Sequence, residues 1–314
     1  MVQKNNLNPK IIIICGPTAS GKSDLAVECA KALDTQVISA DSMYIYKGLN
    51  IGTAKPTLAE MQGVKHHLID VVNPNDNFTV SEYKNLATPI IDNLIKNGKT
   101  PIICGGTGFY INSILYDLSY GKGKEDPKIR EKYKKLCETH GKEYVYNILK
   151  AVDPDSANKL HPNDVKRVIR ALEIFENGTK KSDIIDDLTP KYDYLAYSID
   201  YPRETLYDRI NLRVDNMVKK GLLEEIKRLL DIGLTKENQC MQAIGYKEII
   251  DYFDGNCTFE QAVENIKLNT RHYAKRQITF FKKMPNLKYL APNNIKILTN
   301  EILKDLKNDW RKIN

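Results

Sequence analysis

Cysteine is scarce in this sequence and lacks the paired spacing that metal sites and disulfide frameworks use. The six cysteines are Cys15, Cys29, Cys104, Cys137, Cys240 and Cys257, and no two of them form a Cys-x-x-Cys pair. Cys15 and Cys104 each end an apolar, strand-like run. We therefore expect reduced, mostly buried thiols, and neither a structural zinc site nor a set of disulfides.

Long apolar runs are also absent. The longest, Ile11–Cys15, is far shorter than the ~20 residues that a membrane-spanning helix needs. The segment Met1–Lys10 is polar and lacks the apolar centre of a signal peptide. Internal repeats and low-complexity segments are not found either. These absences favour a cytoplasmic protein that does not enter a membrane.

Neither sign of charge dominates the composition. The chain has 314 residues, with 47 Lys and Arg against 40 Asp and Glu, which gives a net charge of +7. This excess permits a polyanionic partner without requiring one. The length suffices for one large or two modest domains with a sizeable core.

A glycine-rich segment that directly follows an apolar strand is the most informative pattern. The run Ile11–Cys15 is typical of a strand buried on both faces of a parallel sheet, and helical composition begins at Asp24. Between them, Gly-x-x-x-x-Gly-Lys-Ser offers backbone N–H groups, a lysine charge and a hydroxyl for Mg²⁺. The predicted phosphate-binding residues are Gly16, Pro17, Thr18, Ala19, Ser20, Gly21, Lys22 and Ser23. Nucleoside triphosphates are the usual ligands of such a loop, but a diphosphate on a different kind of molecule would suit the same groups. The structural alternative is an ordinary glycine-rich turn that binds no phosphate.

Two more strand ends are expected at the same edge of the sheet. Asp41 follows the short strand around Val37, where a carboxylate could act as a base or bind Mg²⁺ through water. An Asx turn or a helix cap is the structural alternative. The segment 102–108 is a second transition from a strand to glycines, with Thr107 among them. Backbone there can approach a ligand closely, although a packing turn would show the same pattern.

The remaining chain predicts an α/β protein with a helical insertion. We expect strands at 66–72, 195–200 and 287–290, and helices at 79–97, 128–140, 142–152, 165–177, 203–230 with a break near Gly221, 258–283 and around Trp310. The polar linker 121–127 opens a section without a strong strand, so 121–191 is predicted to be the insertion. The cluster Lys166, Arg167 and Arg170 is either a solvated face or a nucleic-acid surface. The last long helix carries cations interleaved with aromatic residues, which also suits a nucleic acid.

Several segments together resemble the bacterial tRNA dimethylallyltransferases, also called tRNA isopentenyltransferases, of the IPP transferase family. The matching segments are Gly-Pro-Thr-Ala-Ser-Gly-Lys-Ser at 16–23, Asp-Ser-Met-Tyr-Ile-Tyr-Lys-Gly-Leu-Asn-Ile-Gly-Thr-Ala-Lys-Pro at 41–56, His-His-Leu-Ile-Asp at 66–70, Gly-Gly-Thr-Gly-Phe-Tyr at 105–110, His-Pro-Asn-Asp-x-x-Arg at 161–167, Ala-Ile-Gly-Tyr-Lys-Glu at 243–248 and Thr-Arg-His-Tyr-Ala-Lys-Arg-Gln-Ile-Thr at 270–279. They follow the family's order and span nearly the whole chain.

The resemblance implies transfer of a dimethylallyl group from dimethylallyl diphosphate to N6 of the adenosine on the 3′ side of the anticodon. It implies a P-loop NTPase-like α/β core at 1–120 and 192–314, and a helical domain at 121–191 that grips the anticodon stem-loop. The P-loop would hold the diphosphate with Mg²⁺, to which Ser23 and Asp41 contribute. Asp41 matches the proposed general base, Thr107 a residue at the donor and adenine site, and Arg213 a cation for the leaving group. The adenosine would flip out of the loop, and a monomer is expected.

The resemblance also implies which residues contact tRNA. They are Asp41, Ser42, Met43, Tyr44, Thr107, Arg130, Lys166, Arg167, Val168, Ile169, Arg170, Gln242, Ala243, Ile244, Gly245, Tyr246 and Lys247, with Arg271, Lys275 and Arg276 as further cations. Gly108 stands where some members have Met, which removes a side chain beside the donor pocket. Two other hypotheses remain open from the residues alone: a small-molecule kinase that uses ATP, and an RNA-binding protein without catalysis.

Overall fold

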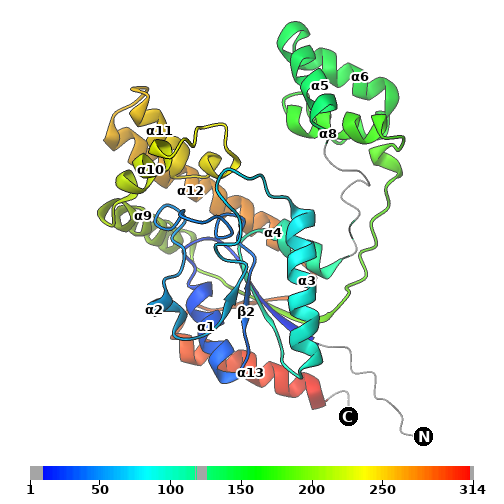
Figure 1. Cartoon of the computed structure of the whole chain (residues 1–314). Coiled ribbons are helices and arrows are strands. Elements are labelled where there is room, and N and C mark those ends of the chain that lie inside the picture. The colour runs from blue at the N-terminus through cyan, green and yellow to red at the C-terminus, as the bar shows by residue number, and fades with distance from the viewer. Residues whose placement is uncertain (1–9, 117, 119–125, 312–314) are drawn as a thin grey trace, which may run out of the picture. The chain divides into compact units, whose positions relative to one another are not determined.

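The computed structural model describes residues 10–116, 118 and 126–311. The chain divides into two compact units. The core unit comprises the described residues up to Leu115 and from Pro190 onward, and the inserted unit comprises those of Tyr116–Thr189. Figure 1 shows that the chain passes from the core unit into the inserted unit and back. We describe each unit by itself.

The core unit is built on a six-stranded sheet in the order β3-β2-β4-β1-β5-β6. All of its pairings are parallel, which confirms the predicted α/β class. The strands are β1 (Lys10–Cys15), β2 (Val37–Ser39), β3 (His66–His67), β4 (Ile102–Gly105), β5 (Asp193–Ile199) and β6 (Leu287–Leu290). Strand β1 lies between β4 and β5, so the carboxyl ends of three neighbouring strands meet where its glycine-rich loop begins.

Both faces of the central strand are covered. Ile12 and Ile14 join a buried cluster with α1 (Lys22–Ala32) and α13 (Ile295–Arg311), which pack on the same face. Side chains alternate along a strand, so Ile11 and Ile13 face the other way, and they are fully buried as well. The run of four isoleucines therefore reflects a strand with no polar face.

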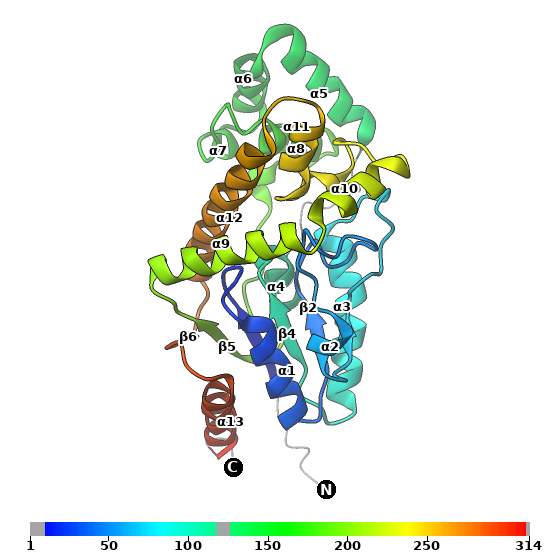
Figure 2. The same cartoon turned by 90° about the vertical axis from the view of Figure 1, so that its left-hand side faces the viewer.

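Further helices complete the core unit. They are α2 (Leu58–Met61), α3 (Val80–Lys96), α4 (Gly108–Leu115), α9 (Arg203–Lys219), α10 (Leu222–Asp231), α11 (Tyr246–Phe253) and α12 (Phe259–Phe281), with a 3₁₀ turn η2 (Gln239–Gln242). Helix α3 begins with a capping box between Thr79 and Glu82, as the cap at Thr79 predicts. Figure 2 shows α9 crossing the end of the sheet at which the loop after β1 lies.

The inserted unit is helical in its described part. It contains α5 (Pro127–His140), α6 (Lys142–Val152), α7 (Pro154–Ala157), α8 (Val165–Glu176) and the 3₁₀ turn η1 (Lys181–Asp183). A cluster of its own, with Tyr133, Val145, Leu149 and Leu172 at the centre, holds these helices together. The chain leaves the core unit after Leu115 and returns before Lys191, and the Lys191 N–H donates to the Leu115 carbonyl at 2.7 Å.

One predicted strand is much shorter than expected. The pattern at 66–72 predicts seven strand residues, but β3 ends at His67. Leu68 and Asp70 have φ values of 62° and 55°, and a chain in this left-handed region cannot continue a strand. The prediction at 68–72 was therefore wrong. Helices α2, α7 and α11 were not predicted at all.

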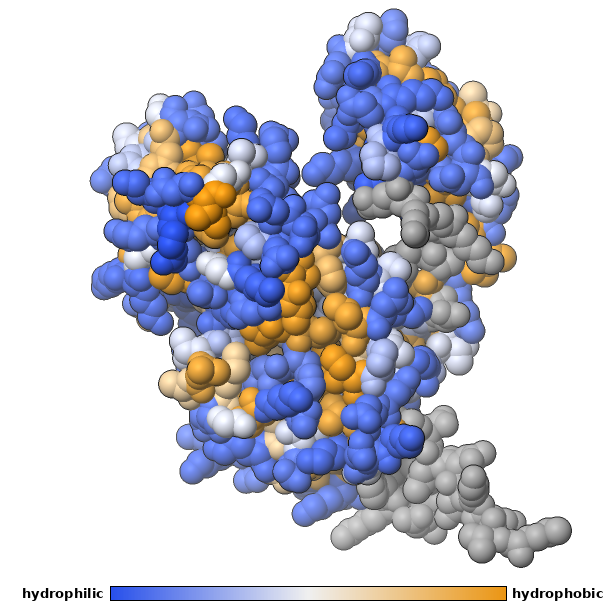
Figure 3. Space-filling view, in the orientation of Figure 1, coloured by the Kyte–Doolittle hydropathy of each residue, from blue (hydrophilic) through white to orange (hydrophobic). Residues whose placement is uncertain are grey.

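Most of the surface shown in Figure 3 is hydrophilic, and apolar residues gather over the middle of the core unit. Within the described ranges, we find no helix with the length and apolar character needed to cross a bilayer.

Candidate active site

The loop between β1 and α1 has the backbone shape that its glycines predict. Gly16 and Gly21 have φ values of 130° and 83°, which disfavour any residue with a side chain. A Cβ at Gly16 would also lie 2.5 Å from the Ser198 hydroxyl oxygen. Gly21 is the N-cap of α1 and has no side chain to cap its free N–H groups. The helix N-terminus is therefore left open to an anion.

Lys22 places a positive charge at this helix end. Its Nζ donates to the Pro17 carbonyl at 3.1 Å, so the side chain folds back along the loop. Burial lowers the pKa of Lys22, and the positive charge of Arg213 lowers it further. A lysine that is poorly solvated and faces another cation gains much from a bound anion.

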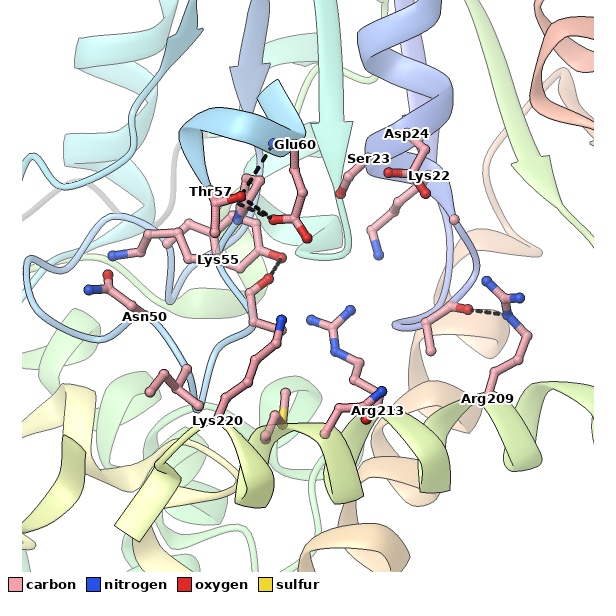
Figure 4. A pocket seen from close by; sticks show the side chains of 18 of the residues that line it. Lys22, Ser23, Asp24, Asn50, Lys55, Thr57, Glu60, Arg209, Arg213 and Lys220 are labelled. Atoms are coloured by element: carbon pink, nitrogen blue, oxygen red, sulfur yellow. Dashed lines mark hydrogen bonds between the residues drawn. The ribbon is translucent and has the colours of Figure 1, made fainter. Parts of the chain in front are cut away.

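A cavity of about 440 Å³ opens beside the loop and the first turn of α1. Its lining includes Ala19, Gly21, Lys22, Ser23 and Asp24 from one side, and Asn50, Ile51, Ala54, Lys55, Pro56, Thr57 and Glu60 from another. Helix α9 adds Arg209, Arg213 and Asn216, and its C-cap residue Lys220 lines the cavity as well. Figure 4 shows Lys22 and Arg213 pointing into this space from opposite sides. Two of the cations on α9 donate to backbone carbonyls: Arg209 Nε to Ala19 at 2.8 Å, and Arg213 Nη2 to Thr53 at 3.1 Å.

Asp41 lies next to the phosphate-binding loop. Together with Lys22, Ser23 and Tyr44 it lines a second, much smaller cavity of about 20 Å³. One carboxylate oxygen of Asp41 accepts the Met43 N–H at 2.9 Å, which is the Asx turn that the sequence left as an alternative. The second oxygen of the carboxylate remains available for chemistry, so the structural and chemical interpretations are compatible.

Thr107 joins the second glycine-rich turn to the residues after Asp41. Its hydroxyl accepts the Ser42 N–H at 3.0 Å, and its own N–H donates to the Ala40 carbonyl at 3.0 Å. Tyr273 on α12 lies beside Thr107, and burial raises the pKa of this tyrosine, which therefore stays neutral. A Cβ at Gly108 would lie 2.1 Å from the Phe280 ring, so an aromatic side chain fills the space that this glycine leaves.

Two buried polar residues, which the sequence interpretation missed, organise the site. Glu225 on α10 is 1% exposed and accepts hydrogen bonds from three successive N–H groups at 50–52. Gln277 on α12 accepts the Thr18 N–H at 2.9 Å and donates to the Gly106 carbonyl at 2.9 Å, which links the two glycine-rich turns. Each occupies a position on the buried face of its helix, where a polar residue needs a partner. That pattern was the signal that could have revealed them.

Comparisons with known proteins agree with this geometry. The family model described as IPP transferase matches residues 44–284. The chain belongs to the IPP transferase family. It is 49% identical over 293 residues to a tRNA dimethylallyltransferase of Caldanaerobacter subterraneus, with 91% of this chain and 93% of the relative covered. A relative of the same description from Alkaliphilus oremlandii is 43% identical, with 98% and 100% covered.

Two solved structures show the same fold. The tRNA isopentenylpyrophosphate transferase of Bacillus halodurans aligns with a TM-score of 0.72 at 39% identity, over 96% of this chain and 98% of that one. A eukaryotic dimethylallyltransferase acting on tRNA aligns with a TM-score of 0.78 at 32% identity, over 92% of this chain and 75% of that one. The P-loop NTPase-like fold and the transferase class predicted from sequence are therefore confirmed.

In this family member the predicted RNA contacts fall into two groups, and the first lies in the inserted unit. The carboxylate of Glu173 is fully buried and accepts two hydrogen bonds from Arg130, at 3.1 and 3.0 Å, and one from Arg170 at 2.5 Å. Burial by itself raises the pKa of Glu173, but these arginines outweigh it and keep the carboxyl ionised. Arg167 is exposed and pairs with Asp164 at 3.1 Å. Lys166 is exposed too, whereas the side chains of Val168 and Ile169 belong to the hydrophobic core of the unit.

The second group lies on the core unit. Gln242 and Lys247 are exposed, Ala243 and Ile244 are partly buried, and Gly245 and Tyr246 are buried. On α12, Lys275 and Arg276 are exposed, while Arg271 donates to Asn211 of α9 at 2.8 Å. The segment 242–247 thus exposes its two end residues and buries Gly245 and Tyr246.

Proposed function

We propose that this chain transfers a dimethylallyl group from dimethylallyl diphosphate to N6 of the adenosine on the 3′ side of the anticodon in tRNA, releasing diphosphate. The curated relatives named above support the reaction. The observation that carries the residue assignment is the cavity in which the phosphate-binding loop and the cationic face of α9 oppose each other. Asp41 and Thr107 stand at the adjoining strand ends, where an acceptor base would meet the donor.

The donor side of the site stabilises a leaving group. A primary allylic diphosphate ionises readily once its developing negative charge is neutralised. The N–H groups of the loop and Lys22 would supply that neutralisation from one side of the cavity, and Arg213 from the other. The atom attacked is a carbon, so the loop binds the departing diphosphate and does not activate a phosphorus.

The residues present fit a magnesium ion that is shared with the substrate. Ser23 and Asp41 line one small cavity next to Lys22. Among the described residues no three His, Cys, Asp or Glu side chains gather into a metal cluster. Mg²⁺ commonly uses one carboxylate, waters and substrate phosphates, so a hydroxyl and a carboxylate beside the diphosphate suffice. When bound there, the ion would neutralise charge on the leaving group.

The acceptor side of the site handles a proton. An exocyclic amine on a purine is a weak nucleophile because its lone pair is delocalised into the ring. Asp41 would accept the N6 proton as the C–N bond forms, while the Met43 N–H fixes the orientation of the carboxylate. The hydrogen bonds of Thr107 to the 40–42 segment fix its position, and from there it would contact the edge of the base.

The cations outside the cavity suit an RNA hairpin. Reaching N6 requires the adenosine to leave its stack, and this is easiest in an unpaired loop. We assign contacts to the anticodon stem-loop to the inserted unit, through Arg130, Arg167 and Arg170, and further contacts to the segment 242–247 and α12. We also expect the inserted unit to act as the domain that grips the stem.

The test uses the purified chain with dimethylallyl diphosphate, Mg²⁺ and unmodified tRNA, and mass spectrometry of the nucleosides. N6-dimethylallyl adenosine should form, and a tRNA with guanosine at the target position should remain unmodified. Absence of the product from the first tRNA would refute the proposal. In a separate assay with ATP and a small acceptor, release of ADP would instead support a kinase.

Asp41→Asn tests the proposed base. We expect single-turnover rates to fall by about 10²–10⁴-fold, the range typical of a lost general base, with tRNA affinity unchanged. Asp24→Asn is a matched control, because Asp24 lines the large cavity and not the small one that Asp41 lines. Normal turnover by Asp41→Asn would show that the proton goes elsewhere.

A further inference from the structure

One wall of the donor cavity is a loop whose position is imposed from outside. The segment 50–56 contributes Asn50, Ile51, Ala54, Lys55 and Pro56 to the lining. Its carbonyls hold two side chains that face the cavity: Thr53 accepts from Arg213, and Ala54 accepts from the Tyr44 hydroxyl at 2.9 Å. A shift of this wall loop would therefore move Arg213, the cation that opposes Lys22.

The wall loop is anchored to the buried carboxylate of Glu225. One oxygen accepts the N–H groups of Asn50 at 3.0 Å and Ile51 at 2.8 Å, and the other accepts that of Gly52 at 3.0 Å. A carboxylate has only acceptors, so it can satisfy three N–H groups that converge on it. Lys55 provides a second anchor from the other end, with its Nζ bonded to the Tyr46 carbonyl and to Asp70, both at 2.6 Å.

Tyr246 links this anchor to the segment 242–247. It is fully buried, and its hydroxyl donates to the second oxygen of Glu225 at 2.7 Å. Its ring lies against the wall loop at Gly52, where a Cβ would come within 2.6 Å of a ring carbon. The same carboxylate thus bonds the wall loop and the first residue of α11, four positions after the exposed Gln242.

We propose that Glu225 and Tyr246 are positioning residues that fix the wall loop, and through it Arg213, at the distance from Lys22 that a diphosphate requires. Neither residue lines the two cavities of the site. Their link also places the wall loop and the proposed RNA-contact segment 242–247 in one hydrogen-bonded assembly. The ligand in this inference rests on the proposed function, but the positioning itself concerns any diphosphate that enters the cavity.

Glu225→Gln is the direct test. A carboxamide keeps the volume of the carboxylate but replaces one of its two acceptor oxygens by an NH₂ donor. At least one N–H of the loop or the Tyr246 hydroxyl therefore loses its acceptor. We expect the affinity for inorganic diphosphate, measured by calorimetry without tRNA, to fall about tenfold, which is the ratio that about 1.4 kcal/mol produces. The KM for dimethylallyl diphosphate should rise more than kcat falls. Tyr246→Phe should weaken diphosphate binding in the same direction but less, because the three N–H bonds remain.

Glu248→Gln is the matched control. Glu248 is also buried, accepts the Gly245 N–H at 2.7 Å and an amide N–H of Asn269 at 2.7 Å, and forms no bond to the wall loop. Its loss should lower Tm as much as Glu225→Gln while leaving diphosphate affinity unchanged. Equal weakening by both variants would reduce Glu225 to a purely structural role and overturn the proposal.

Unchanged diphosphate affinity in Glu225→Gln would overturn it as well, and if that variant does not fold, the same readout on Tyr246→Phe decides. Diphosphate binding is measured without tRNA. A wild-type protein that binds diphosphate and responds to these variants without modifying tRNA would therefore refute the proposed function alone.

Discussion

The cations of the donor cavity and those of the inserted unit are held in opposite ways. Lys22 and Arg213 donate to backbone carbonyls, which are neutral. Arg130 and Arg170 both bond the buried carboxylate of Glu173. In the first arrangement neither cation is bonded to a carboxylate of the described residues, whereas in the second one buried carboxylate bonds and orders both arginines.

This difference suits two kinds of anion. A small diphosphate in a cavity is bound by concentrated charge, and cations that form no ion pair in a poorly solvated site supply it. A long RNA offers phosphates at fixed spacing, and binding it favours guanidinium groups that are already ordered, because ordering a free arginine costs conformational entropy. Four experiments address this contrast.

Lys22→Met should produce the largest effect. In the proposed reaction it removes a cation that faces the leaving group, so we expect turnover at saturating tRNA to fall by about 10²–10³-fold, as for other lost charge-stabilising donors. Affinity for inorganic diphosphate should fall with it, while tRNA affinity should not change. Single-turnover kinetics and tRNA filter binding measure the two. A similar loss of tRNA affinity would mean that the cavity and the RNA surface are not separate in function.

Asp153→Asn examines a carboxylate of the inserted unit that has no cationic partner in its hydrogen bonds. Burial by itself raises the pKa of Asp153, but the hydroxyl groups and the backbone N–H groups of Ser156 and Ser182 outweigh it and lower the pKa to about 2, the two N–H groups each donating at 3.1 Å. The ionised form therefore stabilises the fold above the unfolded-state pKa near 4, by about 2 kcal/mol, and this contribution disappears as the pH falls toward 2. Denaturant unfolding at neutral pH should show this loss in the variant, and the gap between variant and wild type should close in acid. A gap that persists in acid would exclude ionisation as its cause.

The pH dependence of diphosphate binding separates Lys22 from an ordinary lysine. Because burial and Arg213 lower its pKa, Lys22 loses its proton at a lower pH than a solvated lysine, whose pKa is about 10.4. Diphosphate affinity should therefore decline about tenfold per pH unit once the pH exceeds the lowered value. Lys22→Arg keeps its charge across this range and controls for titration of the ligand. Parallel profiles for the two proteins would contradict the shift.

Glu173→Gln should produce the smallest effect, and its direction is the informative part. The change removes a negative charge from the inserted unit, so simple electrostatics predicts tighter tRNA binding. We expect binding about fivefold weaker, because two arginines lose their common anchor at about 1 kcal/mol of ordering. Arg167→Ala should reduce the slope of log affinity against log salt by about 1, as a phosphate contact does. Tighter binding in Glu173→Gln would show that charge alone governs this surface.

Local patterns allowed much of this molecule to be predicted. The order strand, glycine-rich loop and helix around Gly16–Ser23 is encoded in consecutive residues, and so are caps such as Thr79 with Glu82. The prediction of a strand at 66–72 was wrong because Leu68 and Asp70 adopt the left-handed backbone conformation, which their residue types do not predict. The Lys55 ammonium donates a hydrogen bond to Asp70 in this turn, and the local sequence around either residue does not predict that contact.

Buried polar anchors escaped prediction for a related reason. Glu225 and Gln277 join segments more than 170 residues apart in the chain. A single polar residue in an amphipathic helix does not indicate which distant segment it will bond. Val168 and Ile169 show the converse, because the family resemblance groups them with RNA contacts while the α8 periodicity places their side chains in the core. Only the three-dimensional structure shows which residues are buried anchors and which belong to the hydrophobic core.

The hydrogen bond between Lys191 and Leu115 has a consequence for how this protein can be altered. The exit and the return of the chain lie side by side on the core unit, so the intervening segment is grafted at a single point. A tight turn of a few residues would close the gap if that segment were removed, with little loop-closure entropy and no break in the sheet. The same junction would accept a different helical module, so the inserted unit could be exchanged without altering the strands of the core unit.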